Sequence, residues 1–139
     1  MYATRFILAA WLVVITSSSF ADAQSDAIVG VWLTEQADSK IEIGKTASGY
    51  AGKVVWLKEA GNRPTDAKNA DPALRSRPII GVEVVSGVVY NGQGVWRGSL
   101  YSPRKGRSYP AELSLEGGKL MVKAKDGIFS KTVAWTRQQ

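Results

Sequence analysis

Short stretches in which apolar and polar residues alternate fill most of the chain after residue 27. This period of two is typical of β-strands with one buried face, and the stretches are rich in Val, Ile, Trp and Tyr, which favour strands. Ile41 and Ile43, for example, share one face of a stretch that also carries Lys40 and Glu42. The pattern predicts eight strands, at residues 28–35, 40–45, 50–57, 79–85 with an extension toward Tyr90, 94–101, 108–115, 119–125 and 128–137.

The turns between these stretches indicate how the strands pair. Asn91-Gly92, Gly117-Gly118 and Asp126-Gly127 accept the positive φ angles of tight hairpins, so consecutive strands are expected to be antiparallel. Short strands joined by hairpins leave two exposed edges unless the sheet closes. The expected fold is therefore all-β, a small eight-stranded antiparallel up-and-down β-barrel. A two-sheet sandwich is the alternative, but it needs longer crossovers than most of these turns provide.

One connection is long, because residues 58–78 are polar and irregular. Asp71 followed by Pro72 is typical of a helix N-cap and first turn, so residues 73–75 are expected to form one helical turn anchored by Leu74. Long loops in small domains tend to be functional, so this one is a candidate lid over a barrel mouth. Its motif residues are Asp66, Lys68, Asn69, Asp71, Pro72, Leu74 and Pro78.

The N-terminus has the pattern of a secretory signal peptide. Arg5 precedes an apolar run at residues 6–15, and Ala21-Asp22-Ala23 fits signal-peptidase cleavage after Ala23. The run is shorter than the roughly 20 apolar residues of a membrane-spanning helix, although an uncleaved anchor helix is the alternative. We therefore expect a signal peptide at residues 1–23 and a single barrel domain at residues 24–139. The processed protein is expected to be periplasmic or secreted, and not membrane-anchored.

Composition removes most catalytic chemistry. The 139 residues include no cysteine and no histidine, which excludes thiolate and imidazole catalysis, disulfides and the usual zinc site. Asp66 and Asp71 are candidates for a carboxylate pair, but the basic residues beside them favour ionised carboxylates and disfavour a general acid. No glycine-rich phosphate-binding loop occurs. We expect a protein without enzymatic activity, metal or cofactor.

The formal net charge is +6. It survives removal of residues 1–23, because that segment carries one basic residue, Arg5, and one acidic residue, Asp22. A positive charge of this size attracts anionic surfaces or ligands, but it also simply keeps a protein soluble. Nucleic acid is not expected as a partner, because the chain looks exported and lacks a groove-reading motif.

Basic residues on two connections are candidates for an anion-receiving rim at a barrel opening: Arg75, Arg77, Arg104, Lys105 and Arg107. The alternative is structural. Arg75 and Arg77 then hold the long loop through its aspartates, and residues 104–107 form a solvated turn.

Aromatic residues are the second group of candidates. An eight-stranded barrel is either filled by its own side chains or holds one small ligand, and aromatic residues serve both purposes. Trp56, Trp96 and Tyr101 are candidates for a pocket wall, with core packing as the alternative. The candidate ligand-binding residues are thus Trp56, Trp96, Tyr101, Arg75, Arg77, Arg104 and Arg107.

Gly30-Val31-Trp32 on the first predicted strand, with Arg137 at the end of the last, resembles the lipocalin and wider calycin signature. The resemblance implies that Trp32 plugs one barrel end and that the Arg137 guanidinium covers its face, a contact worth about 0.5 to 2 kcal/mol. Closure of a barrel also requires the first and last strands to pair. We therefore assign Gly30, Trp32, Trp135 and Arg137 a structural role.

A second resemblance covers most of the chain after the predicted signal peptide. The motifs are GVWLTE at 30–35, GKVVWL at 52–57, DAKNADPALRSRP at 66–78, IG at 80–81, Trp96, YSP at 101–103, GRSY at 106–109 and WTR at 135–137. In this order they resemble the family catalogued as domain of unknown function 2147. Many members carry cysteines in the strands, absent here, and Ala70 and Ser102 stand where proline and aspartate or asparagine are common. The resemblance implies an exported bacterial protein with a lipocalin-like barrel, and it provides no catalytic residues.

Two functional interpretations follow. The first is a barrel that binds a small amphipathic or anionic molecule in its lumen, with the long loop as a gate. The second is a non-catalytic interaction module that binds an envelope protein or a polyanion through its basic loops.

Overall fold

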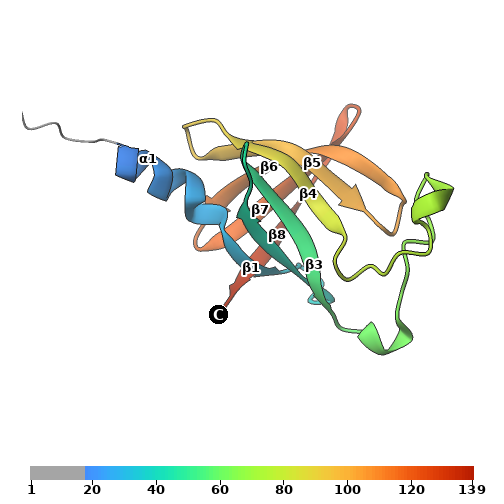
Figure 1. Cartoon of the computed structure of the whole chain (residues 1–139). Helices are drawn as coiled ribbons and strands as arrows, with labels where there is room; N and C mark the ends of the chain where they lie inside the picture. The colour runs from blue at the N-terminus through green and yellow to red at the C-terminus, as the bar shows by residue number, and fades with distance from the viewer. Residues whose placement is uncertain (1–17) are drawn as a thin grey trace, which may run out of the picture.

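The computed structural model describes residues 18–139 (Figure 1). The apolar run of the predicted signal peptide, at residues 6–15, lies outside the described residues. The described chain begins with helix α1 (Ser18–Ser25), which crosses the predicted cleavage point and leads into the 3-10 turn η1 (Asp26–Ile28). Two further 3-10 turns, η2 (Ala60–Asn62) and η3 (Pro72–Leu74), lie in the long loop.

Eight strands form a closed barrel in chain order. They are β1 (Gly30–Leu33), β2 (Ser39–Lys45), β3 (Tyr50–Leu57), β4 (Glu83–Tyr90), β5 (Val95–Ser102), β6 (Arg107–Glu116), β7 (Lys119–Asp126) and β8 (Phe129–Gln138). Every neighbouring pair is antiparallel, and β1 closes the barrel on β8 through the pairs Val31 with Gln138, Trp32 with Arg137 and Leu33 with Thr136. The predicted up-and-down barrel is confirmed.

Two predicted strand starts lie two or more residues before the observed ones. Ile28 belongs to η1, and β4 begins at Glu83 rather than at residue 79. The physical reason at β4 is a turn in which the Val82 amide donates to the Ile79 carbonyl. Gly81 has φ of 97° there, a conformation that strands do not use.

Trp32 closes the barrel end beside α1. Its side chain is fully buried, and its indole nitrogen donates to the Ile28 carbonyl oxygen at 2.9 Å. The Arg137 guanidinium lies 4.2 Å from the ring centroid and donates to the carbonyls of Val29 (2.9 Å) and Ala27 (2.6 Å). The expected contact between the indole and the guanidinium is therefore present.

Gly30 explains why the signature begins with glycine. Its φ of 143° is one that side chains rarely allow, and a Cβ built on it would lie 2.6 Å from Nη1 of Arg137. The missing side chain therefore leaves the space that the guanidinium occupies over Trp32.

The buried core runs along the lumen, and in the half away from α1 its members, among them Ile41, Val54 and Trp135, border a cavity, whereas the half nearest α1 is filled. Buried side chains from five strands pack there: Trp32, Ile43, Val88, Trp96 and Leu120. The Trp96 indole also donates to the Ser25 carbonyl at 2.8 Å, which ties the end of α1 to the core. The other half of the lumen is not filled in this way.

Candidate functional site

A cavity of about 780 Å³ opens at the barrel end away from α1. The loops that surround it join β1 to β2, β3 to β4 and β5 to β6, and in Figure 1 they lie on the side opposite the helix. Its volume falls in the range of about 300 to 1,000 Å³ that is typical of small-molecule pockets. The lining residues are Thr34, Glu35, Gln36, Asp38, Ser39, Ile41, Val54, Leu57, Lys58, Glu59, Pro64, Ile79, Val84, Leu100, Tyr101, Ser102, Pro103, Arg104, Val133 and Trp135.

The lining has an apolar wall and a polar rim. The wall comes from strands and the residue before β4: Ile41, Val54, Leu57, Ile79, Val84, Leu100, Val133 and Trp135. The rim comes mainly from the three loops and carries carboxylates, hydroxyls, an amide and two basic side chains. Such an arrangement suits a ligand with an apolar body and a polar group at one end.

Acidic residues outnumber basic residues at this rim. Lys58 and Arg104 face three acidic residues, Glu35, Asp38 and Glu59. Arg104 is engaged by the β1–β2 loop, because its guanidinium pairs with the Asp38 carboxylate and donates to Gln36 Oε1 at 2.8 Å. The mouth of the cavity therefore carries more acidic than basic side chains, and one of its two basic side chains is already paired.

Asp38 is held in its ionised form. Burial alone would raise its pKa, but hydrogen bonds from Thr34 (2.8 Å) and Ser39 (3.0 Å) and the Arg104 charge outweigh burial and lower the pKa. The carboxylate thus supplies a fixed negative charge at the rim, and it fixes the position of Arg104 at the same time.

The long loop is held against the cavity by Asp66, which is fully buried. Its carboxylate accepts hydrogen bonds from the Tyr101 hydroxyl (2.6 Å), the Asn69 amide (2.8 Å) and Nε of Arg77 (2.9 Å), and Nη2 of Arg77 also lies at 2.9 Å. Burial would raise the pKa of Asp66, but these hydrogen bonds and the charge of Arg77 lower it. Burial and the hydrogen bond to Asp66 raise the pKa of Tyr101. We call these four residues the Asp66 cluster.

Gly106 provides a second contact that docks the long loop. Gly106, in the β5–β6 turn, is buried with φ of 69°, and a Cβ built on it would lie 1.8 Å from the Lys68 carbonyl oxygen. Only glycine lets the turn approach the loop backbone so closely. The loop is therefore docked on β5 and on the β5–β6 turn.

The helical turn of the loop forms as expected, but its anchor is different. The Ala73 amide donates to the Asp71 carboxylate at 3.0 Å, and η3 covers Pro72–Leu74. Leu74 is exposed and does not anchor the loop, because the buried Asp66 carboxylate does so instead. Asn69 contributes by accepting the Asp71 amide at 2.8 Å.

Of the three aromatic residues predicted to form a pocket wall, only Tyr101 lines the cavity. Trp56 is on the outer surface, 38% exposed, with the Lys40 ammonium 5.2 Å from its ring centroid. Trp96 is buried in the α1 half of the core, where its ring lies 4.7 Å from that of Tyr90.

The predicted basic residues share one end of the barrel but do not converge on the cavity. Arg104 alone lines it. Arg77 belongs to the Asp66 cluster, and Arg75 donates to the Asn69 carbonyl at 2.8 Å. Arg107 pairs with Asp126 at 3.3 Å and lies over the Tyr109 ring. The structural alternative for the two loop arginines matches these contacts, although Arg75 bonds a carbonyl rather than an aspartate.

Most residues of the cavity wall were not predicted from the sequence. Trp135, assigned a structural role, is 5% exposed and lines the cavity together with Val133, which has the same orientation on β8 because side chains alternate along a strand. The alternation of side chains along β8 could have predicted that Trp135 and Val133 share one face. It does not indicate where along the lumen the core ends and the cavity begins.

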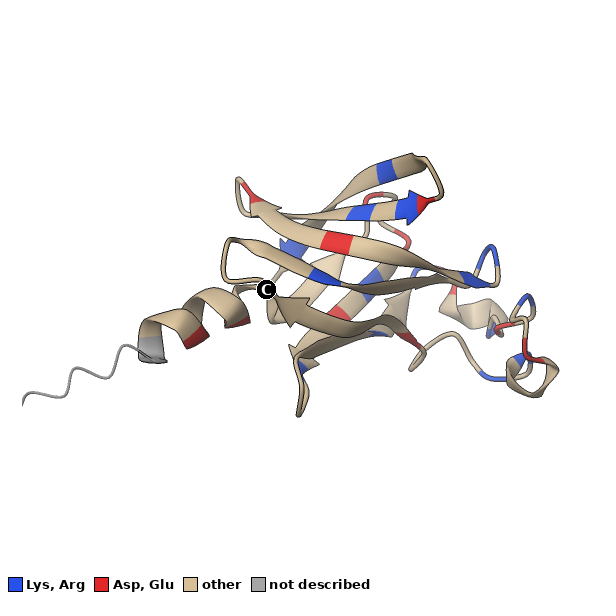
Figure 2. Cartoon of the chain, turned by 90° about the horizontal axis from the view of Figure 1, so that it is seen from above, with Lys and Arg blue, Asp and Glu red and all other residues tan. Residues whose placement is uncertain are grey.

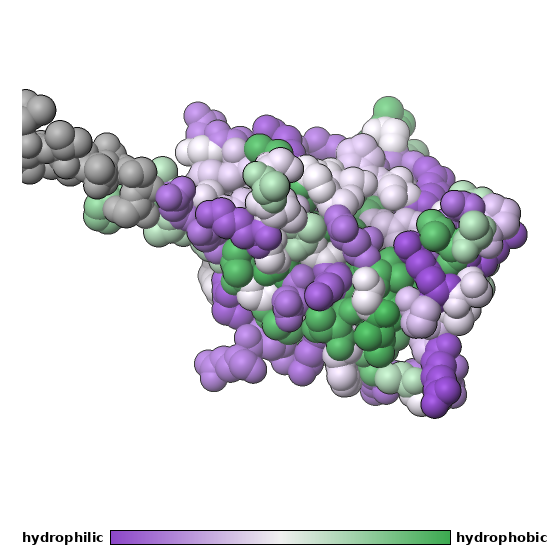
Figure 3. Space-filling view, in the orientation of Figure 1, coloured by the Kyte–Doolittle hydropathy of each residue, from purple (hydrophilic) through white to green (hydrophobic). Residues whose placement is uncertain are grey.

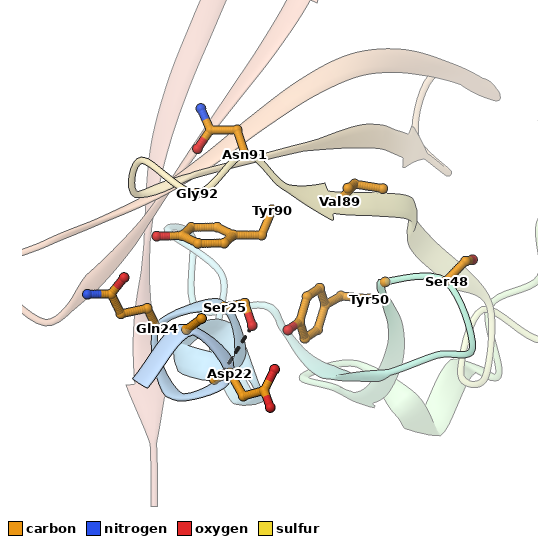
Figure 4. A pocket seen from close by; sticks show the side chains of 11 residues that line it. Asp22, Gln24, Ser25, Ser48, Tyr50, Val89, Tyr90, Asn91 and Gly92 are labelled. Atoms are coloured by element: carbon orange, nitrogen blue, oxygen red, sulfur yellow. Dashed lines mark hydrogen bonds between the residues drawn. The ribbon is translucent and has the colours of Figure 1, made fainter. Parts of the chain in front are cut away.

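A second pocket of about 560 Å³ lies at the opposite end, between α1 and the β2–β3 and β4–β5 turns. Tyr50 and Tyr90 border it near Gln24 and Ser25 of the helix, and the Ser25 hydroxyl donates to the Asp22 carbonyl (Figure 4). Cleavage after Ala23 would remove part of this wall. The cavity at the other end is independent of that cleavage, so we take it as the candidate site.

The fold and the cavity together define the class of protein, a lipocalin-like β-barrel. A solved structure of protein HP1028 from the human pathogen Helicobacter pylori, described as belonging to the lipocalin family, superposes with a TM-score of 0.71 at 21% sequence identity. The match covers 80% of this chain and 82% of that chain, and it establishes similarity of fold.

The chain belongs to the family DUF2147, described as "Uncharacterized protein conserved in bacteria", whose model matches residues 30–137. The resemblance inferred from the spaced motifs is thereby confirmed. No curated protein matches the sequence. Within residues 18–139, no helix is long and apolar enough to span a membrane.

Proposed function

We propose that this protein binds one small amphipathic molecule in the open half of its barrel. The observation that carries the proposal is the cavity of about 780 Å³, which has an apolar wall and a polar rim. The apolar part of the ligand lies between Ile41, Val54, Val84 and Trp135, and its polar part remains at the rim among hydroxyls and charged groups.

The rim favours an uncharged or zwitterionic head over a simple anion. Its acidic residues outnumber its basic ones, and Arg104 is already paired with Asp38. An anionic head would therefore gain little from Arg104 and would lie close to Glu35 and Glu59. The sequence left both an amphipathic and an anionic ligand open. The charge of the rim favours the amphipathic one.

The site works outside the cytoplasm in this proposal. The support is the signal-peptide pattern at residues 1–23, together with the position of the cleavage point at the end of α1. Residues 25–28 lie after that point and are bonded to Trp96 and Trp32, so cleavage leaves the closed end of the barrel intact. Mass spectrometry of protein from the periplasmic fraction is expected to find Gln24 as the first residue, and an intact residue 1 there would refute export with cleavage.

Titration with Nile red, an uncharged apolar dye, tests the binding site. We expect Val133→Phe, which fills the cavity from its wall, to weaken dye binding by about tenfold or more. Val89→Phe is the matched control, because Val89 is exposed on β4 far from the cavity and accepts the larger side chain in solvent. Equal binding by wild type and Val133→Phe would refute the cavity as the site.

Displacement of the dye tests the ligand class. Amphiphiles with the same alkyl chain and either a sugar, a phosphocholine or a sulfate head are compared. We expect the sugar and phosphocholine heads to displace the dye at lower concentration than the sulfate head. A clear preference for the sulfate head would refute the argument from rim charge.

A further inference from the structure

The hairpin between β7 and β8 carries two exposed apolar side chains at its tip. Ile128 is 94% exposed and Phe129 is 73% exposed. Single exposed apolar residues are common on protein surfaces, but two large ones side by side at the end of a projecting hairpin are not expected without a partner. Figure 1 shows this hairpin extending from the barrel, and Figure 3 shows an isolated hydrophobic tip at the same place.

Basic residues surround this tip. Lys125 and Lys131 lie within three residues of Ile128 on β7 and β8, roughly 10 Å along each strand. The pair between Arg107 and Asp126 places the β5–β6 turn, with Lys105, beside the hairpin. Figure 2 shows several blue positions, together with red ones, at this end of the barrel.

Part of this basic charge is not neutralised locally. Lys125 pairs with Glu112 at 2.9 Å and Arg107 pairs with Asp126 at 3.3 Å. Lys105 and Lys131 form no ion pair with any residue in the described range 18–139. An apolar tip surrounded by unpaired ammonium groups is the arrangement that anionic lipid surfaces attract, because the tip enters the interface while the lysines contact the headgroups.

We infer that the β7–β8 hairpin docks this protein reversibly on an anionic lipid surface, with Ile128 and Phe129 as the inserted residues. A lipid surface fits better than a protein partner, because a stable protein interface buries about 800 Å² on each side. An aromatic side chain buries only about 150 to 250 Å², and the hairpin tip offers just one together with one isoleucine.

The position of the hairpin determines which end of the barrel lies near the lipid surface when the hairpin docks. The β7–β8 turn lies at the same barrel end as the β1–β2, β3–β4 and β5–β6 loops that surround the cavity. A docked tip therefore brings the cavity mouth toward the lipid surface, and the acidic side chains of the rim, Glu35 and Glu59, oppose a closer approach of the mouth itself to anionic headgroups. The docking itself does not depend on the proposed ligand binding and is measured without a ligand.

Co-sedimentation with vesicles tests the inference. Protein is purified from cells that express the full chain, and its N-terminus is determined by mass, so that all variants are compared in the same form. We expect binding to vesicles of equal parts phosphatidylcholine and phosphatidylglycerol that weakens with added salt, and much weaker binding to phosphatidylcholine alone. Equal binding to both vesicles, or binding to neither, would overturn the inference.

Variants then assign the binding to the hairpin. Ile128→Ser with Phe129→Ser is expected to weaken partitioning by about tenfold or more, because two apolar side chains no longer enter the interface. Lys105→Gln with Lys131→Gln is expected to weaken it by about twenty-five-fold, at about fivefold for each lysine near the surface. Val89→Ser, at the opposite barrel end, is the control and should bind as wild type does.

The same variants separate this inference from the proposed function. The serine double variant is expected to bind Nile red in solution as the wild type does, because neither side chain lines the cavity. Loss of vesicle binding with unchanged dye binding supports the hairpin as the docking element. Vesicle binding that the serine and glutamine double variants leave unchanged would refute it, even if the cavity binds the dye.

Discussion

Replacement of Asp66 provides a direct test of how the long loop is held. The carboxylate is fully buried and accepts hydrogen bonds from Tyr101, Asn69 and Arg77. In Asp66→Asn the amide oxygen still accepts from Arg77 and Asn69, and the Tyr101 hydroxyl can turn to accept from the amide nitrogen. The substitution therefore keeps the shape of the cluster and removes its charge.

The expected magnitude follows from the hydrogen bonds. A hydrogen bond to a charged group contributes about 1.5 to 3 kcal/mol, compared with about 1 kcal/mol for a neutral one. Arg77 is partly exposed, so water replaces much of what its guanidinium loses. We expect Asp66→Asn to lower the free energy of unfolding by about 2 kcal/mol, and Asp66→Ala, which leaves all three donors without an acceptor, by about 4 kcal/mol.

The pH dependence isolates the charge. The pKa of Asp66 in the folded protein lies below its ordinary value of 3.8. Its contribution is therefore fully present above pH 3.8, and it is lost as the pH falls through the lower folded-state pKa. Asp26, Asp38 and Glu112 also have lowered pKa values, but these groups are present in wild type and in Asp66→Asn alike, so they do not contribute to the difference between the two. The difference between wild type and Asp66→Asn should shrink in that acidic range.

Urea denaturation followed by tryptophan fluorescence measures these differences. Hydrogen exchange at the Ile79 amide, which donates to the Pro64 carbonyl at 3.0 Å, reports whether the loop opens before the barrel unfolds. Faster exchange in Asp66→Ala is expected. Unfolding free energies and exchange rates equal to those of the wild type would refute the assignment of Asp66 as the anchor. If the difference in unfolding free energy between wild type and Asp66→Asn stays constant as the pH falls, the role of the Asp66 charge is refuted.

Three further predictions concern other parts of the barrel. Arg137→Ala should lower the unfolding free energy by about 1 to 2 kcal/mol in urea denaturation, through the lost cover of Trp32; an unchanged midpoint would contradict this. Gly106→Ala should speed hydrogen exchange in the long loop, because the new Cβ displaces the loop backbone, and unaltered exchange would argue against close docking. If the basic loops bind a polyanion, heparin affinity should fall with salt and be lost in Arg104→Ala with Arg107→Ala; retained affinity would exclude that interaction.

The barrel fold could be predicted from the sequence because the signals that define its strands and turns lie within short stretches of the chain. Alternation and hairpin dipeptides set the strands, and the predicted β3 coincides with the observed one. The contact between Trp32 and Arg137 also followed from sequence, because closure brings the first and last strands together. The turn before β4 was not predicted, because the alternation of residues 79–85 favours a strand and does not reveal the positive φ of Gly81.

The wrong position predicted for Trp56 has a specific physical cause. By alternation, Trp56 should share the inward face of Val54. The pairing of β2 with β3 is irregular between Lys40 and Ile41, where Lys40 pairs with Trp56 and Ile41 with Val54. This bulge turns Trp56 outward, and Leu57 lines the cavity in its place. A single sequence does not reveal such a bulge.

The site depends on contacts between distant residues. Arg104 pairs with Asp38, 66 positions away, and Asp66 accepts from Tyr101, 35 positions away. From residue type alone, the arginines were expected to be available to a ligand. The residues that pair with them can be identified only once the barrel has closed. The same closure decides which lumen-facing residues pack together and which border a void.

The division of the lumen into a filled half and an empty half has a consequence for how this protein can change. Substitutions in the wall of the empty half alter the shape offered to a guest molecule, while the indole plug and its guanidinium cover continue to maintain the barrel. If the cavity binds a ligand, its specificity can therefore change without redesign of the barrel end that Trp32 and Arg137 close. A library randomised at Leu100 and Val133, which are only partly buried, should yield mostly folded members with differing ligand preferences.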